Sequence, residues 1–234
     1  MASNQAAEEI APYVVLGMTV VTGLVDAVSF LSLGRVFTAN MTGNVVLLAF
    51  ATARVPGLSF TLSFAALVSF LTGAVLGGRI MARASAGSHI RFAAQAFLLE
   101  VVLLAAAALC GIGYKGDVIE PSVQPLALIA LTALAMGTRN ATVRKLAIPD
   151  VTTTVLTMTL TAIAADSSLA NGNNVRFARR IGAVLAMFSG AALGAVVTGY
   201  SVAAALGLAA AISALCNAAV WWSRPPSEEI ADGT

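Results

Sequence analysis

The chain has 234 residues, of which 59% are hydrophobic and only 10% are charged, and its mean hydropathy is +0.90. A soluble domain carries about a quarter charged residues, so the composition excludes a soluble globular protein and indicates a polytopic membrane protein. The net charge of +2 comes without a basic patch interleaved with aromatic residues, so no nucleic-acid partner is expected. The lipid bilayer is the expected environment of the chain.

Eight apolar runs, separated by charged residues, glycine and proline, follow one another along the sequence. They cover residues 12–34, 36–53, 57–80, 92–113, 126–146, 151–165, 181–199 and 201–222. Six are long enough to cross a bilayer at about 1.5 Å per residue. The second and the sixth run are shorter and rich in Thr and Asn. The predicted fold class is therefore all-α integral membrane, with six transmembrane helices and two short broken or re-entrant segments.

The two halves of the sequence resemble each other. Asp26 aligns with Asn140, and Gly23 with Gly137, at an offset of 114 residues. The runs FLTGAVLGG and FSGAALGA align at an offset of 117, and ALCG and ALCN at an offset of 106. Matches in the same order predict a duplicated unit of four segments. We place an N-terminal tail at 1–11, membrane repeats at 12–120 and 121–223, and a disordered C-terminal tail at 224–234.

The distribution of Lys and Arg predicts how the halves are oriented. If the two short runs do not cross, ten of the 13 basic residues lie on one side, and Arg35, Arg54 and Lys115 lie on the other. If all eight runs cross, the split is 7 to 6. The first arrangement places both termini in the cytoplasm, with three crossings in each half. The halves are then inverted repeats, an architecture typical of secondary transporters.

The stretch RVFTANMTGNVV, residues 35–46, places polar side chains and glycine between two apolar runs. Non-helical backbone at membrane depth is tolerated only where protein or a water-filled cavity surrounds it. We expect a short helix to begin near Met41 and to point its free N–H groups and positive dipole end into the protein. In the second half, Pro149 and Asp150 are expected to end the preceding helix before a Thr-rich run. Two such helix ends near the midplane would form a pocket for a small polar or anionic solute.

The candidate substrate-binding residues come from these two polar stretches and from the end of the fifth run. They are Thr38, Asn40, Thr42, Gly43, Asn44, Asn140, Thr152, Thr153 and Thr154. The alternative is that these side chains only join neighbouring helices, at about 0.6 kcal/mol for each hydrogen bond. We also expect RVFTAN and PDVTTT, residues 35–40 and 149–154, to be extended and to pair with each other across the pocket.

Three ionisable residues lie inside apolar runs. Asp26 and Glu100 each cost about 3 kcal/mol at the bilayer centre on insertion scales, so neither is expected to face lipid. One hypothesis is that one or both carboxylates titrate and couple solute movement to protons. The alternative is a structural charge pair with Arg139, which also lies within an apolar run. We name Asp26, Glu100 and Arg139 as candidate residues for proton or charge coupling.

The predicted function is secondary transport of a small polar or anionic solute in the bacterial inner membrane, with coupling to protons as a hypothesis. The alternative is a non-transporting partner or structural module in which polar residues serve helix packing. No enzyme signature, cofactor motif or metal cluster is present in the sequence, and an intramembrane enzyme would need Asp26 and Glu100 to face each other. Two GxxxG patterns, residues 73–77 and 190–194, predict close helix packing, and they would also suit a homodimer that buries them.

The run GLVDAVSFLSLGRVFTANMTGNVVLL, residues 23–48, resembles the defining stretch of the YoaK family of small bacterial integral membrane proteins. The run GTRNATVRKL, residues 137–146, and the Thr-rich stretch after Asp150 resemble the second half of that family. The resemblance implies an inner-membrane protein. Because the function of the family is uncharacterised, no catalytic or binding residue follows from the resemblance.

Overall fold

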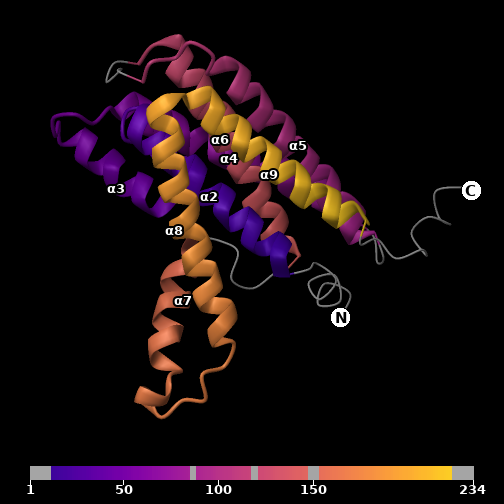
Figure 1. The fold of residues 1–234 in the computed structure, drawn as a ribbon. Helices are drawn as coiled ribbons and strands as arrows, with labels where there is room; N and C mark the ends of the chain where they lie inside the picture. Colours follow the sequence, from indigo (N-terminus) through magenta and orange to yellow (C-terminus); the bar gives the residue numbers. More distant parts are fainter. Residues whose placement is uncertain (1–11, 85–87, 117–120, 147–152, 223–234) are drawn as a thin grey trace, which may run out of the picture.

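The structure is a computed structural model that describes residues 12–84, 88–116, 121–146 and 153–222. Within these residues the chain forms α-helices and one short 3-10 helix, and no strand (Figure 1). The elements are α2 (Pro12–Ser32), α3 (Met41–Thr52), α4 (Phe60–Ala82), α5 (His89–Cys110), α6 (Val123–Lys145), α7 (Thr153–Ala165), η1 (Ser168–Ala170), α8 (Phe177–Tyr200) and α9 (Val202–Trp222).

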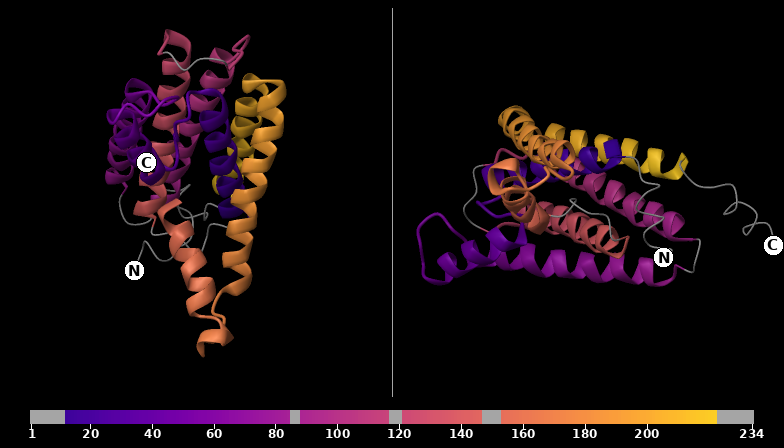
Figure 2. Two further views of the ribbon diagram at one scale, coloured as in Figure 1. Left: turned by 90° about the vertical axis from the view of Figure 1, so that its left-hand side faces the viewer. Right: turned by 90° about the horizontal axis from the view of Figure 1, so that it is seen from below.

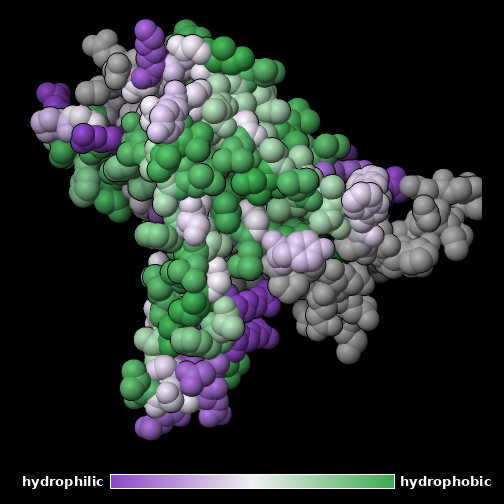
Figure 3. Space-filling model, viewed as in Figure 1, coloured by the Kyte–Doolittle hydropathy of each residue, from purple (hydrophilic) through white to green (hydrophobic). Residues whose placement is uncertain are grey.

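Six of these helices, α2, α4, α5, α6, α8 and α9, are long and apolar enough to cross a membrane. The other two, α3 with 12 residues and α7 with 13, are too short for a full crossing. Hydrophobic residues cover most of the side of the bundle in Figure 3, and many hydrophilic residues lie near the helix ends. Phe188 and Val196 on α8 are 70% and 60% exposed, as suits contact with lipid. The predicted all-α membrane fold is confirmed.

Glycines join α8 to α2 at close range. Gly190 lies against the backbone of Val20, and Gly194 lies against the backbone of Leu24. Since the residue numbers rise together along both helices, α2 and α8 run parallel. A methyl group added at Gly190 would overlap the carbonyl oxygen of Val20, so only glycine permits this approach.

The same arrangement joins α4 to α6. Gly73 lies against the backbone of Leu134 and Gly77 against that of Thr138, so these helices also run parallel. The Thr138 hydroxyl donates a hydrogen bond of 3.2 Å to the carbonyl of Gly73. Both GxxxG patterns therefore serve close packing within the chain, as predicted. Because their glycines are buried there, a homodimer would have to use another surface.

Contacts between other helices show which ones run in opposite directions. Glu100 of α5 meets Ser213 of α9, whereas Gly111, just beyond the end of α5, meets Ala203 near the start of α9. Thus α5 and α9 are antiparallel. The side chain of Gln124, near the start of α6, donates to the carbonyl of Cys110 at the end of α5, so α5 and α6 are antiparallel as well.

Helices α2 and α9 are also antiparallel, because Cys216 lies beside Val14 and Ile212 beside Gly17. Combined with the other pairs, this makes α2 and α4 run in opposite directions, as do α6 and α8. The chain therefore enters α4 on the side where it left α2, so α3 does not carry it across the bundle. The same holds for α7 between α6 and α8. In Figures 1 and 2, α3 and α7 lie toward opposite ends of the molecule.

The expected pairing of two extended segments is wrong for its first member. Residues 36–40 are irregular rather than a strand, because their N–H groups bind side chains instead of a second segment. Residues 149–152 of the other expected member lie outside the described residues, and Thr153 and Thr154 begin α7.

Candidate functional site

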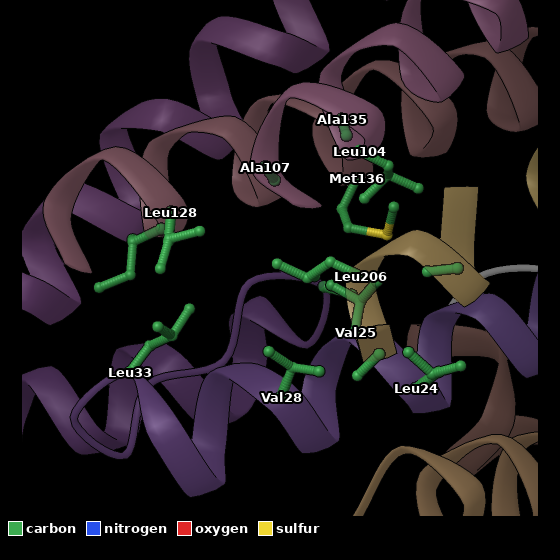
Figure 4. Packing of buried hydrophobic residues seen from close by; sticks show 14 of the residues in the cluster. Leu24, Val25, Val28, Leu33, Leu104, Ala107, Leu128, Ala135, Met136 and Leu206 are labelled. Atoms are coloured by element: carbon green, nitrogen blue, oxygen red, sulfur yellow. The ribbon is translucent and has the colours of Figure 1, made fainter. Parts of the chain in front are cut away.

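Four helices meet at the centre of the bundle, and each contributes to two apolar clusters along its length. In Figure 4, side chains from α2, α5, α6 and α9 point toward one another in the first cluster. The second cluster is built from other turns of the same helices, with Met18, Phe97, Val143 and Cys216 among its members. Near the boundary between the two clusters, four buried polar side chains, one from each helix, contact one another. These are Thr22, Glu100, Arg139 and Ser213.

Arg139 joins these four helices. One terminal nitrogen of its guanidinium group lies 3.2 Å from the Glu100 carboxylate and donates to the carbonyl of Met18 at 3.0 Å. The other nitrogen donates to the Thr22 hydroxyl at 2.7 Å. Glu100 also accepts a hydrogen bond of 2.7 Å from Ser213. The Arg139 and Glu100 side chains are 3% and 2% exposed, so this is a buried, hydrogen-bonded ion pair.

Asp26 lies one helical turn beyond Thr22 on the same face of α2. Its Oδ1 accepts hydrogen bonds from the backbone N–H groups of Ala39 at 2.9 Å and Asn40 at 3.4 Å. These two residues immediately precede α3, whose first residue is Met41, as predicted. Helix dipoles favour negative charge at this end. Asp26 therefore occupies the place near the start of α3 where we expected a solute.

The loop before α3 reaches well inside the bundle. Asp26 lies six residues before the end of α2 at Ser32, which is about 9 Å along the helix axis. Because Ala39 binds Asp26, the chain turns back by this distance after leaving α2. Thr38 and Ala39 are 0% and 1% exposed. Non-helical backbone thus lies buried against α2, surrounded by protein.

Two asparagines hold this loop in place. The Asn40 side chain caps α3 by accepting a hydrogen bond from the N–H of Gly43. Asn44 is fully buried; its amide nitrogen donates to the carbonyl of Ser63 in α4, and its oxygen accepts from the N–H of Phe37 at 3.4 Å. Asn44 therefore ties the loop to α4. Asn40 and Asn44 thus have well-defined structural contacts in this state.

Two buried oxygen atoms near the loop have no hydrogen-bond partner among the described residues. They are Oδ2 of Asp26 and the hydroxyl oxygen of Thr38. An unsatisfied buried polar atom costs about 1–3 kcal/mol, and more when it is charged. The region around Asp26 therefore keeps unused capacity to bind a proton, water or a ligand.

The structure brings together only some of the candidate residues. Thr38, Asn40, Gly43 and Asn44 surround the start of α3, whereas Thr42 is exposed on its first turn. Asn140 lies on α6, where its amide donates to the carbonyl of Met136. Thr152 lies outside the described residues, as do the side chains of Thr153 and Thr154. The contribution of the second half to the site thus stays a prediction.

The sequence profile of the family described as "Protein of unknown function (DUF1275)" matches residues 14–219. The chain belongs to this family. It is also 35% identical over 147 residues to the UPF0700 transmembrane protein YoaK of Bacillus subtilis (strain 168), and the match covers 62% of each chain. No solved structure matches the chain. The resemblance to the YoaK family is confirmed, and the six apolar helices agree with a multi-pass membrane protein.

In this DUF1275 protein, three groups that make buried polar contacts were not predicted from the sequence. They are the hydroxyls of Thr22 and Ser213 and the backbone carbonyl of Ser63. Thr22 precedes Asp26 by four residues. This spacing places both residues on one face of a helix, so the sequence pattern could have indicated Thr22. Ser213 stands in the Ala-rich run AAAISALC and has no such signal. The carbonyl of Ser63 is part of the backbone, so no side-chain pattern indicates its contact with Asn44.

Proposed function

We propose that this protein is a secondary transporter of a small polar or anionic solute, and that solute movement is coupled to protons. The observation that carries the proposal is the buried loop before α3, whose N–H groups converge on Asp26 inside the bundle. Interrupted helices of this kind, with a helix N-terminus near the membrane centre, bind anionic groups in secondary transporters. Irregular backbone at membrane depth is tolerated only where it is buried in protein or lines a water-filled cavity.

The packing of the helices supports an inverted repeat. The first helix of each half, α2 or α6, packs parallel to the third helix of the other half, α8 or α4. Gly23 and Gly137, which align in sequence, both lie in these contacts, against α8 and α4 respectively. Since α2 and α6 run in opposite directions, the halves would be related by an axis in the membrane plane.

The balance of buried charges supports proton coupling. Among the described residues, the buried Asp, Glu, Lys and Arg side chains of the bundle are Asp26, Glu100 and Arg139. With both carboxylates ionised, these three groups carry a net charge of −1. An uncompensated charge is costly inside a membrane protein. Uptake of one proton brings the net charge of these three residues to zero, and Asp26 has an unpartnered oxygen that can accept this proton.

The helix directions also support an orientation in the bacterial inner membrane with both termini in the cytoplasm. Arg35, Arg54 and Lys115 lie at one end of the bundle, beside the ends of α2, α3 and α5. At the other end lie Arg79, Arg83, Arg91, Arg144, Lys145, Arg176, Arg179 and Arg180. The excess of positive charge marks the cytoplasmic side.

The geometry around the two carboxylates gives little support to an intramembrane enzyme. Glu100 faces Arg139 and Ser213, whereas Asp26 faces the loop before α3, so the two do not form a pair of acid and base. The alternative of a non-transporting structural module predicts no solute flux at all. Transport measurements therefore separate it from the proposed function.

The test is uptake of radiolabelled small carboxylates, amino acids and nucleobases into proteoliposomes under an imposed pH gradient, with protein-free vesicles as background. We expect at least one solute to accumulate faster inside the vesicles when the outside solution is more acidic than the inside. Thr38→Val should reduce this uptake by about tenfold or more, the effect of losing one hydrogen bond to a charged group, because the buried Thr38 hydroxyl has no partner among the described residues.

Thr52→Val, at the far end of α3, is the matched control and should leave uptake unchanged, because its exposed hydroxyl donates to the carbonyl of Leu48 in its own helix. A folded protein that passes none of these solutes would contradict the proposal.

A further inference from the structure

We propose that Asp26 occupies the binding position of a carboxylate solute. When Asp26 takes up a proton, its hydrogen bonds from the N–H groups before α3 weaken, and the carboxylate of the solute accepts hydrogen bonds from these N–H groups instead. This inference rests on the proposed transport function and names the class of its substrate, a small organic carboxylate. Transport would then couple one proton to one carboxylate.

The geometry before α3 is that of a carboxylate site. Two successive N–H groups, from Ala39 and Asn40, donate to one oxygen of Asp26, and the N–H of Thr38 also faces this carboxylate. Convergent backbone N–H groups at the start of a helix bind anions through hydrogen bonds and the helix dipole. Since the group bound there is itself a carboxylate, these N–H groups have the donor spacing that another carboxylate needs.

The unpartnered oxygens provide the second observation. An ionised carboxylate accepts at both oxygens, yet Oδ2 of Asp26 has no partner among the described residues. The Thr38 hydroxyl is likewise unpartnered there and fully buried. Oδ2 is free to take the proton, and the Thr38 hydroxyl is free to donate to the second oxygen of an incoming carboxylate.

Two aromatic side chains pack beside the loop before α3. The Phe37 ring stacks on Phe30 with 5.1 Å between ring centroids. It also packs against Gly43 in the first turn of α3, at a distance where a Cβ on Gly43 would be crowded. Asp26 is 5% exposed. In this structure Asp26 is thus buried in the position that the inference assigns to the carboxylate of the solute.

Protonation changes this balance through charge. A neutral Asp26 loses the charge-assisted hydrogen bonds from Ala39 and Asn40, which are about twice as strong as neutral ones. The solute carboxylate then competes for the same N–H groups, and the proton cancels the charge that it brings. Because coupling is reciprocal, a bound carboxylate also strengthens proton binding to Asp26.

Few other charged groups face Asp26. From α6 it faces Arg139, which in turn is paired with Glu100 of α5. Helices α3 and α9 contain no charged residue. On α8, which packs along α2, the charged residues are Arg179 and Arg180 in the first turn, and Arg180 binds Asp166. Asp26 is therefore the group at this site whose proton is expected to control carboxylate binding.

The experiment is titration calorimetry of the full-length protein in detergent with acetate, between pH 6 and pH 8, where acetate stays ionised. The wild type should bind acetate up to about tenfold more tightly for each unit that the pH falls, as one linked proton requires. Asp26→Asn should bind acetate at pH 7 about tenfold more tightly than the wild type, with no dependence on pH.

Asp166→Asn, a carboxylate in the turn after α7, is the matched control and should keep the pH dependence of the wild type. Thr38→Val should weaken acetate binding while keeping that pH dependence, and it tests the site if Asp26→Asn fails to fold. Acetate binding that ignores pH, or no acetate binding by the folded variants, would overturn the inference and make Asp26 a fixed anchor of the loop. Measured flux of a solute other than a carboxylate would then still support the proposed transport function.

Discussion

Arg139→Met is expected to lower the free energy of unfolding by about 3–5 kcal/mol, the cost of breaking a buried ion pair by removing one partner. The methionine fills most of the space but leaves the Glu100 carboxylate charged and buried, with Ser213 as its remaining donor. The hydrogen bonds of Arg139 to Met18 and Thr22 are lost as well. Denaturation of the purified protein in mixed micelles measures the change.

The double variant Arg139→Met with Glu100→Leu is the control for this result. Replacing both charges with apolar side chains removes the uncompensated charge, so its stability should return to within about 1 kcal/mol of the wild type. Recovery of the fold with loss of proton-coupled uptake would show that the pair serves transport. A single variant as stable as the double variant would contradict the buried pair.

Gly77→Ala should destabilise the protein by about 1–3 kcal/mol, the usual cost of an extra methylene in a well-packed site. The new methyl group would overlap the carbonyl oxygen of Thr138, and since this neighbour is backbone, α4 and α6 have to move apart. The neighbouring Gly78 has no atom within 4 Å of the same position among the described residues.

Gly78→Ala is therefore the matched control, one residue away on the same helix. It should stabilise α4 by about 0.5–1 kcal/mol, because alanine loses less conformational freedom than glycine in a helix. Thermal unfolding of both variants in one detergent tests the pair. Equal effects of the two substitutions would contradict the close contact of α4 with α6.

The sequence predicted the parts of this fold that depend on local pattern. Apolar runs gave the helices because their lengths must match the bilayer, and the glycine spacing gave the close contacts. The start of α3 at Met41 followed from the polar stretch before it. Arg139 could be named as a partner because few charges occur inside apolar runs, although its choice of Glu100 over Asp26 was left open.

What the sequence did not predict depends on contacts between distant segments. Backbone N–H groups carry no side-chain signal, so the convergence of residues 39 and 40 on Asp26 could be found only in the structure. The expected extended segment does not form there, because Asp26 accepts the hydrogen bonds that a second strand would have accepted. Ser213 could not be distinguished from the other small residues of α9, since only its position beside Glu100 makes it important.

The most direct test of the account is the side of the membrane on which two loops lie, because every functional argument needs α3 and α7 to turn back without crossing. Arg54→Cys and Arg176→Cys, each in a background with Cys110→Ala and Cys216→Ala, are labelled with a membrane-impermeant maleimide in intact cells and in inverted vesicles. We predict that position 54 reacts only in cells and position 176 only in inverted vesicles. Labelling of both positions from the same side would contradict the inverted arrangement and the transport proposal with it.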